Sequence, residues 1–569
     1  METIKLLCIN KEGGSGLHRV SYFNKLNGVE IEGKKIEVTI KDFSETTLKE
    51  AEDFNILLYH WDINLTFTEL GQLQAKGVKI AYSLDDFYEF SILHPYYQNE
   101  QLRNYTKQRI RTHLLNANCV ITTTQRLAWN CLQYNDNVAI ISNFLNPEDF
   151  KIGEKTKSDK LRVGFTNSIS HYPDMLMFKQ VINKLAKNKK IVENVEFCLY
   201  GVDSNDSKWQ DIIKLFTVKK NLTVTIKEFL PVGEYMNFYN SLDVCLMPLE
   251  MTEFNYSKSA LKLAECALSN TLPIGSSLYS GKELKGIVVC ETPQQYEETI
   301  EKLLDKEYYN QVLKYVTEVN LKDNDYNKRF EDTLKVVNTV YSEDLSPKLD
   351  DIKLWSIVYD NDNQIAEYEK YDNSGIRTVE QKSYLFEWNA ILDIIDNKLE
   401  NEDYLGVFSW KLGQRTGFTK NILLKSLKFY NYKDYDVINL TPNYKELNLN
   451  YYAWTNNYHP TFLDKFTKVC NHVGLVVKEP KTVVISNMVI AKKEVYKDFV
   501  NNYAKKAIDF MHENFEEFNE NAHYGSGLPA EELEKFTGMQ YYNFFTFVLE
   551  RMWSAYIENK ILLKVKNLL

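Results

Sequence analysis

Three charged side chains have types and a spacing that could bind an anion. Lys258, Lys262 and Glu265, in the sequence FNYSKSALKLAECALSNTLP, occupy positions i, i+4 and i+7 and would share one face of a single helix. Two cations and a carboxylate near a helix start suit a phosphorylated ligand with a sugar hydroxyl beyond it. A hydroxyl of Ser257 or Ser259 would cap the helix by accepting from an unpaired amide. The alternative is a surface helix with an ordinary ladder of charges.

An acidic pair occurs earlier in the chain. Asp85 and Asp86 follow the predicted strand Val78–Tyr82, and ligands of open α/β sheets bind beyond the carboxyl ends of the strands. These carboxylates could orient acceptor hydroxyls, act as a base, bind a metal or cap the next helix. His94 is a weaker candidate at the same edge. We therefore place all three residues on the catalytic side of a predicted cleft.

A glycine-rich turn, KEGGSGLHRV, follows the first predicted strand. Small residues there let the backbone approach a ligand at the following helix N-terminus, so Gly14, Ser15 and Gly16 are candidate ligand contacts. The pattern differs from the dinucleotide-binding fingerprint, and a plain tight turn explains it equally well. His18, next in the chain, fits a structural histidine better than a base.

Composition predicts a globular, enzyme-sized protein. The 569 residues are 44% hydrophobic and 26% charged, enough for about two to four domains. The net charge of −10 argues against a large nonspecific nucleic-acid surface. Eight scattered cysteines without a CxxC pair indicate buried thiols in a reducing compartment. Neither a signal-like N-terminus nor a membrane-length apolar run is present in the sequence, so we expect a cytoplasmic location.

Short apolar runs alternate with amphipathic stretches through residues 1–150 and again through 151–342, which predicts two doubly wound α/β domains facing a cleft. The polar segment 143–160 is the predicted hinge. The predicted strands are Ile4–Ile9, Ile36–Ile40, Asn55–Tyr59, Val78–Tyr82, Cys119–Thr122 and Val138–Ile141, then Leu161–Thr166, Val195–Tyr200, Leu222–Ile226, Val244–Met247, Leu272–Ile274 and Ile287–Cys290.

Several phrases of residues 1–342 occur in the order typical of one enzyme family. They are GGSG, the DD pair, ISNFLNPEDF, VGFTNSISHYPDM, PVGEYMNFYNSLDVCLMPL and FNYSKSALKLAECALSNTLPIGSS. Together they resemble the GT-B retaining glycosyltransferases, in particular bacterial and phage members with an FNxSK-type motif. The resemblance implies a transferase of hexosyl or pentosyl groups that takes its sugar from a UDP- or GDP-linked donor and needs no further cofactor.

The resemblance also implies roles for individual residues. Lys258 and Lys262 would neutralise the donor diphosphate, Glu265 would hold the ribose hydroxyls, and the Gly164–Ser168 loop would lie near the base or phosphates. His171 would contact the donor phosphates or cap the following helix. Ser257 stands where many relatives carry a first glutamate, and Lys258 would supply charge that other relatives place elsewhere. Retention of configuration by front-face attack, without a metal, is expected.

Residues 352–569 predict a different, aromatic-rich α/β domain. Phrases such as DYLGVFSWKLGQRTG and NFFTFVLERMWSAYI resemble a GT-A-like domain of bacterial capsular-polysaccharide proteins. Asp360 and Asp362 follow an early strand and could equally form a turn. The alternatives are a second transferase domain and an accessory domain that binds acceptor or forms homo-oligomers.

Three functions remain open from the sequence. The first is transfer of a sugar to a glycan in polysaccharide biosynthesis or to another hydroxyl acceptor, including a phage component. The second keeps the fold but glycosylates a hydroxymethylated DNA base, against which the net charge counts. The third is a noncatalytic glycan-binding or scaffold protein.

Overall fold

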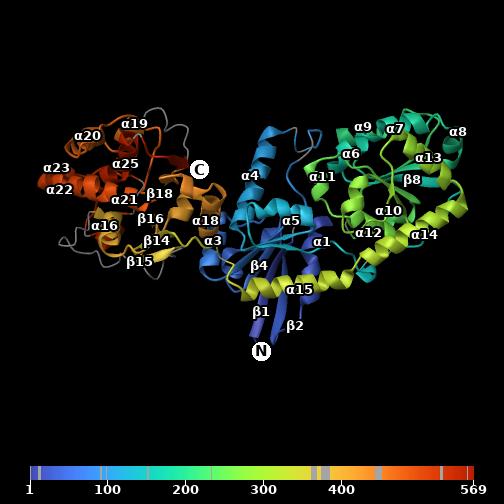
Figure 1. Cartoon of the computed structure of the whole chain (residues 1–569), viewed down its shortest axis with the longest axis horizontal. Coiled ribbons are helices and arrows are strands. Elements are labelled where there is room, and N and C mark those ends of the chain that lie inside the picture. Colours follow the sequence, from blue (N-terminus) through green and yellow to red (C-terminus); the bar gives the residue numbers. More distant parts are fainter. Residues whose placement is uncertain are drawn as a thin grey trace. The chain divides into compact units, whose positions relative to one another are not determined.

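The computed structural model describes residues 2–10, 14–89, 92–95, 97, 99–149, 153–231, 233–345, 347–359, 368–372, 385–442, 451–525, 529–537, 539–560 and 562–568 (Figure 1). The chain forms two compact units. Unit 1 contains Met1–Leu65 and Val78–Leu345, and unit 2 contains Thr66–Gly77 and Ser346–Leu569.

The first sheet of unit 1 is parallel except for one short edge strand. Its order is β2 (Glu30–Ile31), β3 (Lys34–Asp42), β1 (Glu2–Asn10), β4 (Ile56–His60), β5 (Lys79–Ser83), β6 (Cys119–Thr122) and β7 (Val138–Ile140), with β2 antiparallel to β3. Its helices are α1 (Gly14–Arg19), α2 (Leu48–Ala51), α4 (Glu100–Asn116) and α5 (Gln125–Leu132). The chain leaves β1 first toward β3 and then toward β4, so a switch point lies at the carboxyl ends of β1 and β4.

The second sheet of unit 1 is fully parallel, in the order β10 (Thr223–Glu228), β9 (Val195–Val202), β8 (Leu161–Thr166), β11 (Val244–Met247), β12 (Leu272–Gly275) and β13 (Val288–Val289). Phe197 and Leu199 of β9 belong to one core, and the intervening Cys198 and Tyr200 belong to the core on the other face. Burial of both faces explains why these strands are apolar throughout. The predicted α/β fold class with paired parallel sheets is confirmed.

Ten α-helices follow the first sheet in the described part of unit 1: α6 (Tyr172–Leu176), α7 (Phe178–Leu185), α8 (Lys189–Asn194), α9 (Ser207–Thr217), α10 (Asn237–Asn240), α11 (Glu253–Ser257), α12 (Leu261–Leu268), α13 (Pro293–Leu303), α14 (Lys306–Asp323) and α15 (Tyr326–Ser342). The last of them returns to the first sheet, because Val337 and Val340 of α15 lie in the core of that sheet. Arg329 of α15 also donates to the carbonyl oxygen of Phe144 at 2.6 Å.

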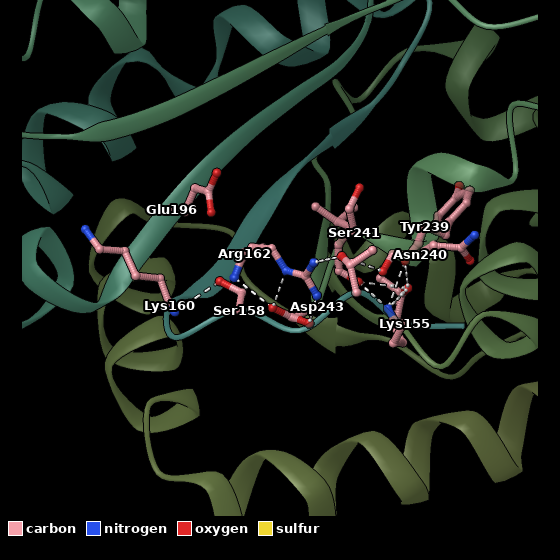
Figure 2. Close-up of polar contacts among 12 residues, drawn as sticks. Lys155, Ser158, Lys160, Arg162, Glu196, Tyr239, Asn240, Ser241 and Asp243 are labelled. Carbon is pink, nitrogen blue, oxygen red and sulfur yellow. Dashed lines mark hydrogen bonds and ion pairs between the residues drawn. The ribbon is translucent and has the colours of Figure 1, made fainter. Parts of the chain in front are cut away.

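The end of the predicted hinge is fastened to the amino edge of the second sheet (Figure 2). Half-buried Lys155 donates from Nζ to the Tyr239 carbonyl oxygen at 2.9 Å, to Thr271 Oγ1 at 2.8 Å, and to the Leu242 carbonyl oxygen. Arg162, at the start of β8, pairs with Asp243 at 2.8 Å. The connection between the two sheets therefore ends in a fixed anchor before β8 begins.

Unit 2 has a mixed sheet in the order β15 (Glu369–Asp372), β14 (Ile352–Val358), β16 (Tyr404–Ser409), β18 (Val489–Lys492), β17 (Val437–Asn439) and β19 (Val565–Asn567). Only β18, among the described strands, is antiparallel to its neighbours. The helices are α3 (Phe67–Ala75), α16 (Glu387–Asn397), α17 (Leu412–Thr416), α18 (Lys420–Phe429), α19 (Tyr451–Tyr458), α20 (Phe462–His472), α21 (Lys493–Phe499), a π-helix (Val500–Ala504), α22 (Lys505–Glu513), α23 (Phe515–Phe518), α24 (Ala530–Thr537) and α25 (Phe544–Asn559).

The aromatic residues of unit 2 mainly fill its core. Trp388, Phe499 and Trp553 are fully buried in one cluster, and the Phe499 and Trp553 ring centroids lie 3.9 Å apart. All eight cysteines of the chain are buried free thiols, as predicted. None of the helices in the described ranges combines the length and apolar character that crossing a bilayer requires.

Candidate functional site

The segment with the three charged residues forms two short helices instead of one. α11 ends at Ser257, the backbone of the following Lys258 is extended (φ −64°, ψ 146°), and α12 starts at Leu261. Lys258 therefore lies on the link, and only Lys262 and Glu265 share a helix. The expected cap by Ser257 or Ser259 is wrong, because α12 has no side-chain cap at its preceding residue.

Two neighbouring residues that the sequence did not single out hold this link. Lys282 Nζ donates to the carbonyl oxygens of Asn255 at 3.0 Å and Tyr256 at 3.1 Å, and to that of Lys258. Burial lowers the pKa of Lys282 to about 8. Glu283 accepts from the Ala260 backbone amide at 2.8 Å. Carbonyl oxygens at the end of α11 and an amide at the start of α12 have no partner within their own helices. Side chains from one later loop supply those hydrogen bonds.

The extended link places Lys258 against His171. Lys258 Nζ lies 3.2 Å from His171 Nε2, and His171 Nδ1 lies 2.7 Å from an oxygen of Asp174. Asp174 also accepts from the side-chain amide of Asn255 at 2.9 Å. Burial, and then the charges of Lys258 and Lys262, lower the pKa of His171 to about 3. His171 is therefore neutral, and it orients the lysine at the carboxyl end of β8.

The second lysine reaches the same strand end from α12. Lys262 Nζ donates to the Thr166 carbonyl oxygen at 3.2 Å and to Asn167 Oδ1. Burial lowers the pKa of Lys262, and the nearby Lys258 lowers it further. Two ammonium groups close enough to repel each other favour an anion that contacts both. Ser168 follows on the same loop, where its hydroxyl contacts Ser170 at 2.7 Å.

Glu265 lies one turn further along α12 and is 5% exposed. Its Oε1 accepts from the Tyr235 hydroxyl at 2.7 Å, and its Oε2 accepts from the Tyr239 hydroxyl at 2.6 Å. A carboxylate held in this way can accept from hydroxyl groups without leaving its position.

A cavity of about 560 Å³ lies at the carboxyl ends of β8, β9 and β10. Lys262 contacts its lining at Thr166 and Asn167, and Glu265 contacts it at Tyr235. The cavity is lined by the loop that follows β8, by the ends of β9 and β10, and by Tyr235 and Phe238. The other residues that line the cavity are Thr166, Asn167, Ser168, Ile169, Gly201, Val202, Asp203, Trp209, Glu228, Phe229 and Leu230. Its size suits a nucleoside.

The acidic pair of the first sheet has two different environments. Asp85 accepts from Trp61 Nε1 at 2.9 Å and lies 3.3 Å from His60 Nε2. Burial raises the pKa of Asp85, but His60 and Trp61 outweigh it and hold the pKa well below its usual range. Burial raises the pKa of Asp86 to about 6, although the charges of Lys258 and Lys282 oppose this. Asp86 is thus the carboxyl group that lies near the lysines.

His94 also lies near Lys258. It is 2% exposed, and its ring meets the Phe254 ring edge to face with centroids 5.2 Å apart. Lys258 Nζ lies 4.4 Å from the centroid of that Phe254 ring. Burial, and then the charge of Lys258, lower the pKa of His94 to about 4. The neutral ring packs behind the lysine.

The two predicted serines and the glycine turn lie on the first-sheet side. Ser257 Oγ accepts from Asn130 of α5 at 3.1 Å, and Ser259 Oγ accepts from the Asn143 side chain at 3.2 Å. These hydroxyls join the two sheet domains and do not face the cavity lining. The predicted Gly14, Ser15 and Gly16 form the start of α1, at the carboxyl end of β1. Gly13 lies outside the described residues.

Sequence reasoning missed the side chains that position the charged ones. Tyr235 and Tyr239 have an i, i+4 spacing in GEYMNFYN, which marks one helical face but reveals no partner. Asp174, Lys282 and Glu283 carry no distinctive pattern. No group of three or more His, Cys, Asp or Glu side chains in the described ranges could hold a metal ion.

No protein-family model matches the chain, and no curated protein matches it in sequence. Solved structures of similar fold include the following three. Sucrose-phosphate synthase from Thermosynechococcus elongatus is 11% identical, with a TM-score of 0.41, over 60% of this chain and 100% of that chain. The UDP-forming trehalose-phosphate synthase from Burkholderia xenovorans is 11% identical, with a TM-score of 0.42, over 60% of this chain and 100% of that chain. An alpha-glucosyltransferase in complex with UDP-glucose and DNA is 9% identical, with a TM-score of 0.39, over 59% of this chain and 100% of that chain. These likenesses concern the fold alone.

Proposed function

We propose that unit 1 is a retaining glycosyltransferase that takes a sugar from a UDP- or GDP-linked donor and transfers it to a hydroxyl group. The observation that supports this most is the placement of Lys258 and Lys262. Both ammonium groups lie near His171 at the carboxyl end of β8. Lys262 donates to Thr166, which lines a cavity together with Tyr235, the hydrogen-bond partner of Glu265. The two cations match the diphosphate of a sugar nucleotide, the cavity matches its base, and the Glu265 carboxylate matches its ribose.

The chemistry follows from charge that develops on the leaving group. When the bond between the anomeric carbon and the donor phosphate oxygen breaks, the electron pair remains on the diphosphate. Lys258 and Lys262 stabilise that charge without a metal ion. In front-face attack the acceptor oxygen forms the new bond from the same side, and its proton passes to an ionised carboxylate of the site.

Asp86 is the residue proposed to orient the acceptor hydroxyl. It follows β5 of the first sheet, and it is the acidic residue on which the charges of Lys258 and Lys282 act. An ionised carboxylate accepts a hydrogen bond from the hydroxyl and makes its oxygen a better nucleophile. Asp85 is held by Trp61 and His60 and is proposed to position the loop.

Unit 2 is proposed to be an accessory, acceptor-binding part. In this unit burial raises the pKa of Glu387 to about 7; Arg415, Asn487 and Ser409 oppose this shift and the charge of Glu550 adds to it. Two acidic side chains with a single cation suit neutral hydroxyl groups better than a diphosphate. The expectation for Asp360 and Asp362 lies outside the described residues. Glu387→Gln should raise the acceptor KM and leave donor affinity unchanged.

A donor screen tests the main proposal. The full chain would be incubated with UDP- and GDP-linked sugars, and hydrolysis and transfer would be measured for wild type, Lys258→Ala and Glu265→Ala. Lys187→Ala is the matched control, because Lys187 is an exposed lysine of the same domain. Wild-type rates in both site variants would contradict the assignment.

The same screen separates the other functions. A wild-type chain that binds none of these donors is better described as a glycan-binding or scaffold protein. Retention of DNA containing hydroxymethylated bases on a gel, abolished by salt, would instead point to a nucleic-acid acceptor.

A further inference from the structure

Glu265 has no carboxylate oxygen that is free of a strong donor. Tyr235 occupies Oε1 at 2.7 Å and Tyr239 occupies Oε2 at 2.6 Å. Each carboxylate oxygen has two lone pairs, but Glu265 is 5% exposed, and Tyr235, not Glu265, lines the cavity. A ribose diol that approaches from the cavity therefore reaches Oε1 only if it displaces the Tyr235 hydroxyl.

The two tyrosines differ in how firmly they are held. Tyr239 is 1% exposed and stands on α10, its hydroxyl accepts from Thr166 Oγ1 at 3.1 Å, and its carbonyl oxygen accepts from Lys155. Tyr235 lies on the turn before α10, is half-buried and lines the cavity. Tyr235 is thus the one whose hydroxyl can move away without opening the core.

Tyr235 also reaches the first-sheet domain. Its hydroxyl oxygen lies 3.3 Å from His18 Nε2, in the last turn of α1. Burial lowers the pKa of His18 to about 4, so the ring is neutral. Because Tyr235 gives its single hydrogen to Glu265, His18 Nε2 must donate to the tyrosine oxygen. One hydroxyl therefore connects the carboxylate on α12 to a helix of the other sheet.

We propose that Tyr235 is a specificity-determining residue that competes with the ribose diol for Glu265, and that donor binding breaks its contact with His18. This rests on the proposed function. The Tyr235 hydroxyl lowers the affinity for nucleotides with a diol and links their binding to the contact between the two sheet domains. A nucleotide without the diol leaves Tyr235 on Glu265 and the His18 contact intact.

Calorimetric titration of the full chain with UDP and GDP, and with their 2′,3′-dideoxy forms, tests the proposal. Tyr235→Phe should tighten binding of the ribonucleotide about three- to tenfold, the value of one hydrogen bond, and leave the dideoxy form unchanged. His18→Ala should produce a smaller gain for the ribonucleotide and add nothing in the Tyr235→Phe background. Tyr309→Phe is the matched control, because the Tyr309 hydroxyl donates to Asp243 at 3.1 Å, away from the cavity lining.

Each outcome decides the matter. If Tyr235→Phe weakens the ribonucleotide, leaves it unchanged, or tightens both nucleotides equally, then competition for the diol is wrong while the proposed donor site stands. If wild type binds neither UDP nor GDP, the proposed function fails and this inference fails with it. Thermal unfolding of each variant identifies any change that comes from loss of the fold.

Discussion

Lys258 donates to a neutral His171, with Nζ and Nε2 separated by 3.2 Å. An oxygen of Asp174 lies 2.7 Å from Nδ1 and keeps the ring hydrogen on that nitrogen. Nε2 therefore presents a lone pair to the ammonium group of Lys258. The histidine therefore orients a cation instead of acting as one. Removal of that cation is the most direct test of the site.

Lys258→Ala should lower kcat/KM with the nucleotide sugar about 10²- to 10³-fold, comparable to loss of one charge-stabilising donor. Lys258→Arg should recover part of the activity, because it keeps the charge but not the geometry. Steady-state kinetics against the Lys187→Ala control measures this. An unchanged rate for Lys258→Ala would remove the residue from the donor site.

The pH dependence of turnover should report Asp86. Burial raises its pKa to about 6, and only the ionised form can take the proton of the acceptor hydroxyl. The rate should rise with pH to a plateau, with a midpoint near that pKa. Asp86→Asn should lower the plateau and abolish the midpoint. If the asparagine variant keeps the same midpoint, another group controls the rate.

Folding stability should fall as the solution becomes acidic. Burial lowers the pKa of His18 and His94 to about 4 and that of His171 to about 3. The pKa of a histidine in the unfolded chain is about 6.5. Between these pKa values the unfolded state binds more protons than the folded state. Each histidine therefore lowers the free energy of unfolding by up to about 1.4 kcal/mol for each pH unit of acidification. Asp86 partly opposes this, since its raised pKa makes the folded state bind a proton below about pH 6. Urea unfolding at several pH values checks the direction, and His171→Phe should flatten the slope.

Lys282→Met should destabilise the link that carries Lys258. The variant leaves the carbonyl oxygens of Asn255, Tyr256 and Lys258 without their shared donor, which costs about 1–3 kcal/mol. The free energy of unfolding measures the loss. Lys285→Met, an exposed lysine three residues away, is the control, and equal effects of the two variants would contradict the capping role.

Gly164→Ala should destabilise the second sheet strongly. A Cβ at Gly164 on β8 would overlap the carbonyl oxygen of Cys198 on β9, so the strands would have to separate, at a cost of about 3 kcal/mol or more. The control is Gly233→Ala, since no atom lies within 4 Å of a Cβ at Gly233. Thermal unfolding of the two variants should differ by several degrees.

Much of the fold could be predicted from local pattern. Short runs such as Val244–Met247 are apolar at every position, which is typical of a strand covered on both faces. The candidate site is predicted less completely, because the spacing of Lys258, Lys262 and Glu265 favours one continuous helix. The charge pattern carried no sign of the break at Lys258, which depends on Lys282 and Glu283 from a later loop.

The sequence by itself determined the strand pattern, the paired α/β domains and the residue types at the candidate site, because periodicity and charge are local properties. The tertiary structure decided which of those residues meet. It set Lys258 beside His171 and gave Asp85 a hydrogen bond from Trp61. It also gave each carboxylate oxygen of Glu265 a hydrogen bond from a tyrosine hydroxyl. Those contacts join segments far apart in the chain, and only packing of the complete sheets brings them within hydrogen-bond distance.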